Sequence, residues 1–470
     1  MEKYDFGLVG LGVMGRNFIL NVAESGFSAY GLDLSQEQVD ALLNEAAKDF
    51  DNIKATCSTE SFIKGLATPR KIMMLVPAGK PVDMVIESLL PYLEEGDLLI
   101  DGGNSFFTDT DRREAYLKEK GISFFGTGVS GGAKGARVGP SIMPGGNKEA
   151  YKHIQPIFEA AAANAPDGKP CVAYLGKKSA GNYVKMVHNG IEYGLMQLTS
   201  EIYDILRKGG GLTNGELHEV YSNWNQGRLQ SFLVEISAAI FKQKDEHTDG
   251  SLVDAILDKA KQKGTGKWTS QNAMDLGIPV PTIDIAVSMR EISALKNQRI
   301  KADQLYDRPE IQKADVEELK AQCEQALYFA FVLTYAQGLH QLAVASEEYE
   351  YELDLKIIAQ IWRAGCIIRA GLLEDIMQAF DKDPNMVNLL MSPVFVESLQ
   401  NAVPEVRKLV SYAVQNGIPA PGLSNALTYF DAFTSSRLPL NLVQAQRDYF
   451  GSHTYERIDR DGIFHTVWES

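Results

Sequence analysis

The amino-acid sequence predicts an α/β domain with a mostly parallel sheet, then a large all-α domain built from a duplicated helical unit, and a C-terminal tail. Short apolar runs alternate with amphipathic stretches over the first ~180 residues, as in parallel sheets with crossover helices. After Gly181 the patterns are long and helical, and they repeat. We expect the domains at residues 1–178 and 179–435, and the tail at 436–470.

A glycine-rich turn opens the first domain. The apolar run 6–9 leads into Gly10, Leu11, Gly12, Val13, Met14 and Gly15, and a helical pattern follows. Glycines at these spacings allow a sharp turn, close approach of the backbone to a pyrophosphate, and close packing of helix on strand. Free N–H groups at the helix start bind phosphate. The context favours a Rossmann-type dinucleotide site over a plain structural turn.

Asp33 ends the second predicted strand. A carboxylate there accepts hydrogen bonds from the ribose of NAD and repels the 2′-phosphate of NADP. It also suits a turn, because Leu34 and Ser35 lead into a helix start, and the two roles are compatible. Arg16 is the only basic residue between the glycine-rich turn and Lys48. We therefore expect NAD as the preferred cofactor, with NADP as the alternative.

The remaining predicted strands are residues 28–32, 71–76, 98–100, 122–125 and 171–175, the last of which closes the series. Parallel sheets bind ligands beyond the carboxyl ends of their strands. The loops there carry Gly, Pro, Asn and Ser, which suit tight turns near a bound molecule. We expect cofactor contacts from Val76, Pro77, Ala78 and Asn104.

Composition restricts the class of partner. The 470 residues carry a formal net charge of −15, which argues against nucleic acid and anionic membrane surfaces. No apolar run is long enough to span a bilayer, and the early first strand leaves no room for a signal peptide. The cysteines have no paired spacing, so neither disulfides nor a metal site is expected: Cys57, Cys171, Cys323 and Cys366. We expect a cytoplasmic protein.

The second domain repeats itself. Three motifs recur in the same order about 140 residues apart, which indicates a duplicated unit. They are residues 194–198 and 338–342, the Trp-Gly pairs Trp224/Gly227 and Trp362/Gly365, and residues 277–281 and 417–421.

The first copy carries four polar residues on one helical face: Lys185, His188, Asn189 and Glu192. Their spacings of three, four and seven residues place them together. The corresponding residues of the second copy are apolar: Phe329, Val332, Leu333 and Ala336. The fold therefore does not require the polar groups, which favours chemistry over a solvated stripe. A buried lysine can accept a proton at neutral pH and a buried glutamate can donate one.

Further basic residues follow. Residues Lys263 to Thr269 form a basic, glycine-interrupted loop that can hold a phosphate, although their order is not that of a P-loop. Arg290 lies on a later helical face, and Arg447 and His453 lie in the last segment. Taken singly, such residues are more often surface charges than ligands.

Together these stretches closely resemble the long-form decarboxylating 6-phosphogluconate dehydrogenases over essentially the whole chain. The helix from Gly181 to Tyr193 and the loop with Trp268 are highly specific to that family, whereas the glycine-rich turn is not. The other resembling stretches are residues 101–105, 128–132, 140–146 and 446–453.

The resemblance implies oxidative decarboxylation of 6-phosphogluconate to ribulose 5-phosphate, with hydride transfer to NAD(P). Lys185 would take the proton of the C3 hydroxyl, and Glu192 would assist protonation at C1. Residues that would orient the sugar acid are Asn104, Ser130, Gly131, Gly132, His188 and Asn189, and those that would hold its phosphate are Tyr193, Lys263, Thr265 and Arg290. In the family, Arg447 and His453 come from the tail of the partner subunit, which implies a homodimer.

Two departures from the family concern the cofactor. NADP-using members carry Asn-Arg-Thr where this chain has Asp33-Leu34-Ser35, and often Lys where it has Pro77. Both changes remove positive charge near the expected 2′-phosphate, which again favours NAD. Ala133-Lys134 replaces a commonly acidic pair, and no consequence follows from the sequence.

Two other functions stay open. Other β-hydroxyacid dehydrogenases share the fingerprint and the lysine helix, but lack the second helical copy and the Arg447 tail. An inactive dinucleotide-binding regulatory protein would have no need of Lys185, Glu192 and the phosphate-binding residues.

Overall fold

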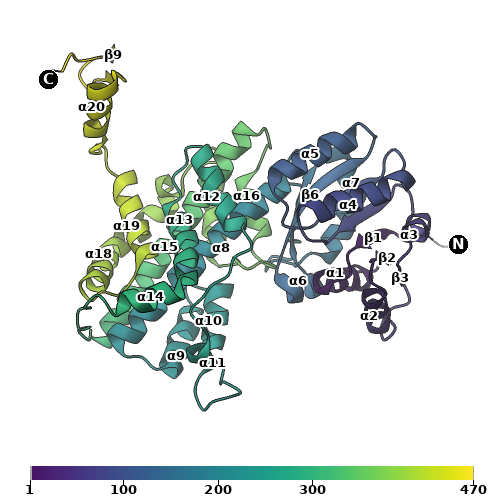
Figure 1. Ribbon diagram of the computed structural model, residues 1–470, viewed down its shortest axis with the longest axis horizontal. Helices are drawn as coiled ribbons and strands as arrows, with labels where there is room; N and C mark the ends of the chain where they lie inside the picture. Colours follow the sequence, from purple (N-terminus) through teal and green to yellow (C-terminus); the bar gives the residue numbers. More distant parts are fainter. Residues whose placement is uncertain (1–2, 469–470) are drawn as a thin grey trace.

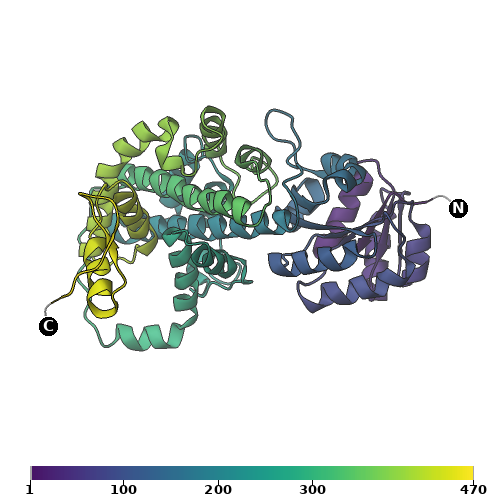
Figure 2. The same cartoon turned by 90° about the horizontal axis from the view of Figure 1, so that it is seen from above.

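The computed structural model describes residues 3–468. An α/β domain and a larger helical domain lie side by side along the long axis of the molecule (Figures 1 and 2). The chain ends in a short tail that projects from the helical domain on the side remote from the α/β domain (Figure 1). No helix within this described range is long and apolar enough to cross a membrane.

The α/β domain contains a seven-stranded sheet of order β3-β2-β1-β4-β5-β6-β7. The first six strands are parallel and β7 is antiparallel to β6. The strand order reverses between β1 and β4, where open α/β sheets bind ligands. The strands are β1 Phe6–Val9, β2 Ala29–Leu32, β3 Ile53–Thr56, β4 Lys71–Met74, β5 Leu98–Asp101, β6 Ser123–Ser130 and β7 Ser141–Gly146.

Helices cover both faces of this sheet. One apolar cluster contains side chains of α1, α2, α6 and α7, and a second contains those of α3, α4 and α5. Strand residues alternate between the two clusters, as the period of a strand requires. The helices are α1 Val13–Glu24, α2 Gln36–Ala46, α3 Thr59–Gly65, α4 Lys80–Leu89, α5 Phe107–Lys118, α6 Gly132–Val138 and α7 Lys148–Ala161, with a 3-10 turn η1 Leu90–Tyr92.

The predicted strand at residues 171–175 is wrong. This segment makes only isolated bridges, Ile142 with Val172 and Gly145 with Gly176, and the sheet ends at β7. The sequence analysis did not predict β3 or β7. β3 lies at the sheet edge and is only half-buried, so its apolar signal is weak, and β7 ends in Pro-Gly-Gly, residues that are depleted in strands.

The helical domain is built around two long helices, α8 and α15. Its elements are α8 Ala180–Ile205, η2 Leu206–Gly210, α9 Asn214–Trp224, α10 Phe232–Lys242, α11 Leu252–Ala255, α12 Thr265–Asp275, α13 Pro281–Ala294, α14 Lys296–Asp303, α15 Val316–Glu348, α16 Leu355–Ile361, α17 Leu372–Lys382, η3 Leu389–Met391, α18 Pro393–Gln415 and α19 Pro421–Phe433. The predicted architecture of an α/β domain followed by a large helical domain is confirmed.

The structure also contains the repeat. α17 begins 140 residues after α10, and α19 begins 140 residues after α13. α8 and α15 pack closely at the two repeated glycines. A Cβ added at Gly194 would lie 2.6 Å from the Thr334 side chain, and one added at Gly338 would lie 2.5 Å from that of Ile191. Glycine at both positions therefore allows a side chain of one copy to pack directly against the backbone of the other.

Glu201 joins α8 to the start of α19. Its side chain is 3% exposed, and its two oxygens accept hydrogen bonds from the backbone N–H of Gly422 at 2.7 Å and Leu423 at 2.9 Å. Burial raises the pKa of Glu201 to about 7, against the opposing effect of these bonds and of the bond from Gln197. The carboxyl satisfies two N–H groups that the helix itself leaves free.

We expect Glu201→Ala to lower the free energy of unfolding by about 3 kcal/mol, because two buried backbone donors lose their acceptor. Urea denaturation followed by circular dichroism measures this change. Glu219→Ala is the matched control, since Glu219 is an exposed residue of α9, and we expect a change within about 0.5 kcal/mol. Equal midpoints for the two variants would show that the contact to α19 adds no stability.

The tail consists of α20 Leu440–Gly451 and a small hairpin of β8 Tyr455–Glu456 and β9 Ile463–Phe464. Every residue from 432 to 443 is exposed, so the connection from α19 runs free of the helical core. Large apolar side chains of the tail are also exposed, including Leu442, Phe450 and Val467. In this chain the tail leaves much of its apolar surface uncovered.

Candidate active site

α8 begins on the carboxyl-terminal edge of the sheet and continues into the helical domain. Glycines make this close approach possible: a Cβ added at Gly181 would lie 2.1 Å from the carbonyl oxygen of Gly126 in β6. A Cβ added at Gly128 would lie 2.4 Å from that of Lys185. The second turn of α8 therefore lies directly on β6, and Lys185 and His188 lie near Ser130 at the end of that strand.

A chain of polar contacts connects the two domains at this point. His188 Nε2 lies 3.3 Å from Ser130 Oγ, and His188 Nδ1 lies 3.3 Å from Lys185 Nζ. His188 Nδ1 also lies 3.1 Å from Asn189 Oδ1, and the Asn189 amide donates to Thr265 Oγ1 at 3.1 Å. The structure thus brings together the four predicted polar residues of α8, since Glu192 Oε2 lies 3.9 Å from His188 Nδ1.

Burial sets the charges of these groups. Burial lowers the pKa of Lys185, and the Glu192 carboxylate only partly opposes the shift. Burial raises the pKa of Glu192, against the attraction of Lys185 and Arg290. His188 is fully buried, and both burial and Lys185 lower its pKa. A neutral amine and a protonated carboxyl therefore become accessible on one helix, seven residues apart.

Residues of the second copy pack against this polar cluster, and the sequence analysis identified them only as repeat markers. The Trp362 ring meets the His188 ring edge-to-face, with centroids 5.5 Å apart. Gly131 has φ 108°, and a Cβ there would lie 2.6 Å from the carbonyl oxygen of Gly365. The repeated Trp-Gly pair was the signal in the sequence that could have identified these residues, because residues that mark a repeat can also lie at a functional site.

The residues predicted to hold the substrate phosphate, here called the phosphate cluster, are Tyr193, Lys263, Thr265 and Arg290. The Arg290 guanidinium lies 3.5 Å from the centroid of the Tyr193 ring, and a Cβ at Gly266 would touch that ring at 2.4 Å. Arg290 is half-buried, and its predicted role as a phosphate ligand stays a prediction. Lys263 is exposed in the segment before α12.

The predicted loop from Lys263 to Thr269 is only partly a loop. Gly264 has φ 96° and forms the N-cap of α12, which begins at Thr265. The loop therefore ends in the first turn of a helix, where N–H groups without a helical partner favour an anion. Gly264 adopts the left-handed conformation that glycine allows at such a cap.

Three further predicted substrate residues lie at the sheet edge. Asn104 is exposed in the loop after β5, and Asp101 braces that loop by accepting from the Gly103 N–H at 3.0 Å and the Ser105 hydroxyl at 2.6 Å. Gly131 and Gly132 begin α6 with φ 108° and 63°. Their conformation suits glycine, and their N–H groups lie at a helix start.

The glycine-rich turn has the form that a dinucleotide requires. A Cβ at Gly15 would lie 1.9 Å from the carbonyl oxygen of Gly10, so helix and strand pack at contact distance there. A Cβ at Gly12 would meet nothing within 4 Å, so this glycine faces open space at the start of α1. Asp33 accepts from the Leu11 N–H at 2.7 Å and the Ser35 N–H at 2.9 Å.

The other predicted cofactor residues lie around this turn. Leu34 is 94% exposed, and Ser35 is the N-cap of α2 without a side-chain capping bond. Val76 is half-buried, and Pro77 and Ala78 are exposed in the loop after β4. Val13 is exposed and Met14 half-buried in the first turn of α1.

The structure does not bring Arg447 and His453 to the site of their own chain. Both belong to the projecting tail, away from the α/β domain (Figure 1). Within residues 3–468, no group of three or more His, Cys, Asp or Glu side chains is arranged to hold a metal ion.

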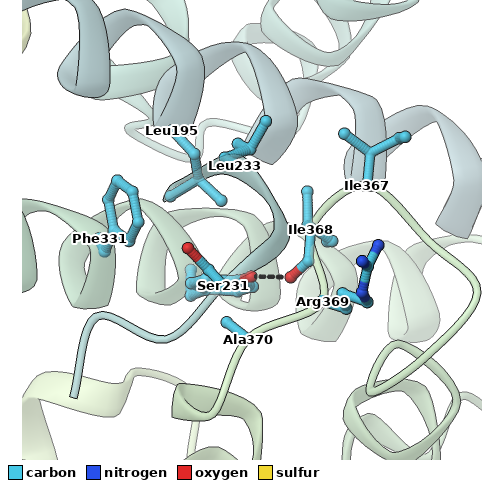
Figure 3. A pocket seen from close by; sticks show the side chains of 9 residues that line it. Leu195, Ser231, Leu233, Phe331, Ile367, Ile368, Arg369 and Ala370 are labelled. Carbon is cyan, nitrogen blue, oxygen red and sulfur yellow. Dashed lines mark hydrogen bonds between the residues drawn. The ribbon is translucent and has the colours of Figure 1, made fainter. Parts of the chain in front are cut away.

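An apolar gap lies elsewhere in the helical domain, where residues 367–370 meet α8, α10 and α15. Figure 3 shows Leu195, Leu233, Phe331 and Ile368 around it. The gap has no room for a water molecule, and Tyr335 closes it by donating to the Ile368 carbonyl at 2.5 Å. It is a packing feature of the core rather than a ligand site.

Comparison with known proteins agrees with this geometry. Residues 5–176 match the family described as the NAD binding domain of 6-phosphogluconate dehydrogenase, and residues 181–468 match its C-terminal domain. The "6-phosphogluconate dehydrogenase, NADP(+)-dependent, decarboxylating" of Bacillus subtilis is 52% identical over the whole of both chains. The decarboxylating 6-phosphogluconate dehydrogenase of Escherichia coli K12 is 49% identical, again over the whole of both chains.

A solved structure is similar over the same extent. The 6-phosphogluconate dehydrogenase of Plasmodium falciparum superimposes with a TM-score of 0.96 at 44% identity, and the match covers 99% of this chain and 100% of that one. That protein is described in its apo form and in complexes with its cofactor NADP+ and with its substrate 6-phosphogluconate. With both domains matched and relatives near half identical over the full length, this chain belongs to the 6-phosphogluconate dehydrogenase family.

Proposed function

We propose that this protein converts 6-phosphogluconate to ribulose 5-phosphate and carbon dioxide, the decarboxylating step of the pentose phosphate pathway, with a nicotinamide dinucleotide as hydride acceptor. One observation carries the proposal. A buried lysine and a partly buried glutamate share one face of α8, between the dinucleotide-binding edge of the sheet and the phosphate cluster. The site thus offers a base, an acid and an anion site for one substrate.

The residues of the sheet edge fit a dinucleotide. The open space at Gly12 and the start of α1 suit a pyrophosphate, which the backbone of Gly10 to Gly15 would hold. Asp33 to Ser35 would flank the adenosine ribose, and Val76 to Ala78 with Asn104 would flank the rest of the cofactor. When bound, the nicotinamide accepts the hydride that leaves C3 of the substrate.

Lys185 acts as the base in the first step. Its neutral amine accepts the proton of the C3 hydroxyl while the hydride leaves C3, so the carbon becomes a ketone. The resulting ammonium then donates a hydrogen bond to the new carbonyl. Because the ketone is β to the carboxylate, the C–C bond to the carboxylate breaks, carbon dioxide leaves, and the electron pair forms an enediol.

Glu192 completes the reaction as an acid. Burial keeps its carboxyl protonated at higher pH than usual, so it can deliver a proton to the carbon that lost carbon dioxide. Protonation of that carbon gives ribulose 5-phosphate, while Lys185, neutral again after it has protonated the carbonyl oxygen during decarboxylation, takes back the proton of the enediol hydroxyl. His188 and Asn189, which hydrogen-bond across the pocket, orient the sugar acid with Asn104, Ser130, Gly131 and Gly132.

The phosphate of the substrate would lie at the phosphate cluster. Arg290, stacked on Tyr193, supplies positive charge, and the start of α12 at Thr265 supplies N–H donors. Lys263 adds a second cation in the adjacent exposed segment. The tail of a second subunit would supply Arg447 and His453, so the functional unit is a homodimer. The exposed apolar side chains of the tail support this assembly.

A substrate comparison tests the function. Purified protein is mixed with cofactor and with 6-phosphogluconate, gluconate or 3-hydroxyisobutyrate, and reduced nicotinamide is followed by absorbance while released carbon dioxide is trapped. We expect turnover with 6-phosphogluconate alone. The amount of carbon dioxide released should equal the amount of reduced nicotinamide formed. Preference for 3-hydroxyisobutyrate would identify another β-hydroxyacid dehydrogenase, and no turnover with any substrate would favour the regulatory protein.

We further propose that NAD is the preferred cofactor, although the Bacillus subtilis relative is described as NADP(+)-dependent. Asp33 places a carboxylate beside the glycine-rich turn, and Leu34 extends into solvent where a cation would be needed. Arg16, the nearby cation, is engaged by Gln38 at 2.8 Å. A 2′-phosphate would meet repulsion there without compensation.

We expect kcat/KM with NAD to exceed that with NADP by about tenfold, the effect of about 1.4 kcal/mol. The double variant Asp33→Asn/Leu34→Arg is expected to lower this ratio about tenfold or more, because it removes a negative charge and adds a guanidinium that can pair with phosphate. Asp40→Asn is the control, since it removes a charge from the exposed face of α2. A clear NADP preference of the unaltered protein would contradict the proposal.

A further inference from the structure

The tail has a buried acidic centre. Asp448, in α20, is fully buried, although most residues around it are exposed. Its Oδ1 accepts from the Thr454 N–H at 3.0 Å and from His465 Nδ1 at 2.8 Å. Its Oδ2 accepts from the Thr466 N–H at 3.1 Å and from Trp468 Nε1 at 2.9 Å. One carboxylate therefore joins three segments of the tail.

These bonds decide the charge of the group. Burial alone would raise the pKa of Asp448, but the hydrogen bonds from His465, Thr466, Trp468 and Thr454 outweigh burial and lower it to about 2. The carboxylate is thus ionised, and each oxygen has two donors. Because a small segment has little apolar core of its own, such a polar centre defines the conformation of the tail.

The two proposed phosphate ligands are attached to this centre. Arg447 precedes Asp448 in α20, and His453 lies between Ser452 and Thr454, whose φ values are 50° and 63°. Non-glycine residues adopt this left-handed conformation only where contacts hold it. The Thr454 N–H bond to Asp448 is one such contact.

A second contact links the same residues. Gln444 donates to the Thr454 carbonyl at 2.6 Å and accepts from Arg447 Nη1 at 3.2 Å. His453 also packs edge-to-face against Phe450, with ring centroids 6.0 Å apart. The backbone beside His453 and the side chain of Arg447 are therefore held in one arrangement before any second subunit is met.

We propose that Asp448 is a positioning residue that presets Arg447 and His453 for the phosphate of the substrate bound in the other subunit. This role rests on the proposed function, because it requires those two residues to reach that phosphate. A ligand set that is already ordered loses less entropy on binding substrate. Loss of Asp448 should therefore weaken substrate binding and leave the chemistry at Lys185 intact.

The test compares Asp448→Asn with Asp461→Asn. Both remove one negative charge from the tail, but Asp461 is exposed. For Asp448→Asn we expect KM for 6-phosphogluconate to rise about tenfold or more, kcat to change by less than about threefold, and KM for the cofactor to stay constant, the signature of lost uniform binding. Asp461→Asn should behave as the unaltered protein.

Trp468→Phe provides a milder test, because it keeps an aromatic ring and removes one of the four donors. We expect KM for the substrate to rise a few-fold, with the oligomeric state in size-exclusion chromatography unchanged. In a protein that already carries Arg447→Ala and His453→Ala, adding Asp448→Asn should raise KM no further, since the residue acts through those two.

Three results would overturn the role of Asp448. They are equal KM values for Asp448→Asn, Trp468→Phe and Asp461→Asn, a parallel fall of kcat in both tail variants, and a full further effect in the Arg447→Ala/His453→Ala background. Failure of the proposed function gives a different result, because the unaltered protein would then not turn over 6-phosphogluconate at all.

Discussion

Replacing Lys185 with methionine is expected to lower kcat/KM for 6-phosphogluconate by about 10³- to 10⁴-fold, because the reaction loses its only positioned base. The amine lies in a buried pocket, 3.3 Å from His188, and methionine fills the same volume without accepting a proton. Steady-state kinetics with saturating cofactor measure the loss. Binding of the cofactor, followed by fluorescence titration, should not change.

The fold should tolerate this substitution. The corresponding residue of the second copy is Phe329, which is fully buried in the equivalent helix, so the architecture accepts an apolar side chain at this position. We expect the thermal midpoint of Lys185→Met to equal or exceed that of the unaltered protein, because a buried polar amine is replaced by an apolar side chain. Lys242→Met, an exposed position of α10, is the control and should keep full activity.

The pH dependence of kcat/KM distinguishes a Lys185 that acts as the base from one that only supplies positive charge. Lys185 must be neutral to accept the proton, so kcat/KM should fall as the pH drops below its lowered pKa. Glu192 must be protonated to donate, so activity should fall as the pH rises above its raised pKa. The profile is therefore bell-shaped. Residual activity of Lys185→Met that kept the acidic limb would show that another group is the base.

The sequence alone was sufficient to predict those site residues that differ in chemistry between the two copies of the repeat. Lys185 and Glu192 stood out because Phe329 and Ala336 occupy the same positions of an otherwise similar helix. Internal duplication thus acted as a control within one chain. The glycine-rich turn and Asp33 were also predictable, because their roles depend on a local turn between a strand and a helix.

Other parts depend on contacts that no local pattern encodes. The Trp362 ring contacts the His188 ring between the two copies of the helical unit. The residues next to Trp362 in the sequence do not predict that contact. β7 was missed because an antiparallel edge strand can contain Pro144 when its partner tolerates the missing donor. The sequence analysis gave Asp448 no role of its own, and only the folded tail shows it buried.

Two variants that are each strongly impaired should restore activity to one another when they form a mixed dimer. The Lys185→Met homodimer lacks its base, and the Arg447→Ala homodimer should lose about 30-fold or more in kcat/KM, the effect of a phosphate ligand worth at least 2 kcal/mol. Co-expression with two different affinity tags, followed by two purification steps, isolates the mixed dimer.

If each tail serves the other subunit, the mixed dimer contains one intact site. The subunit with Arg447→Ala keeps its own Lys185, and its site receives the unaltered Arg447 of the partner subunit. We therefore expect about half of the unaltered activity per dimer, since a two-fold symmetric dimer has two sites. The other site carries both defects and contributes nothing measurable.

A tail that folded back onto its own subunit would give the opposite result, because each site of the mixed dimer would then carry one defect. The activity per mixed dimer would then equal the mean of the activities of the two parent homodimers. The exposed connection from residue 432 to 443 leaves the tail clear of its own core, which is why we expect restoration. Mixing Lys185→Met with Glu192→Gln is the control, since both changes lie on α8 and each site of that dimer stays defective.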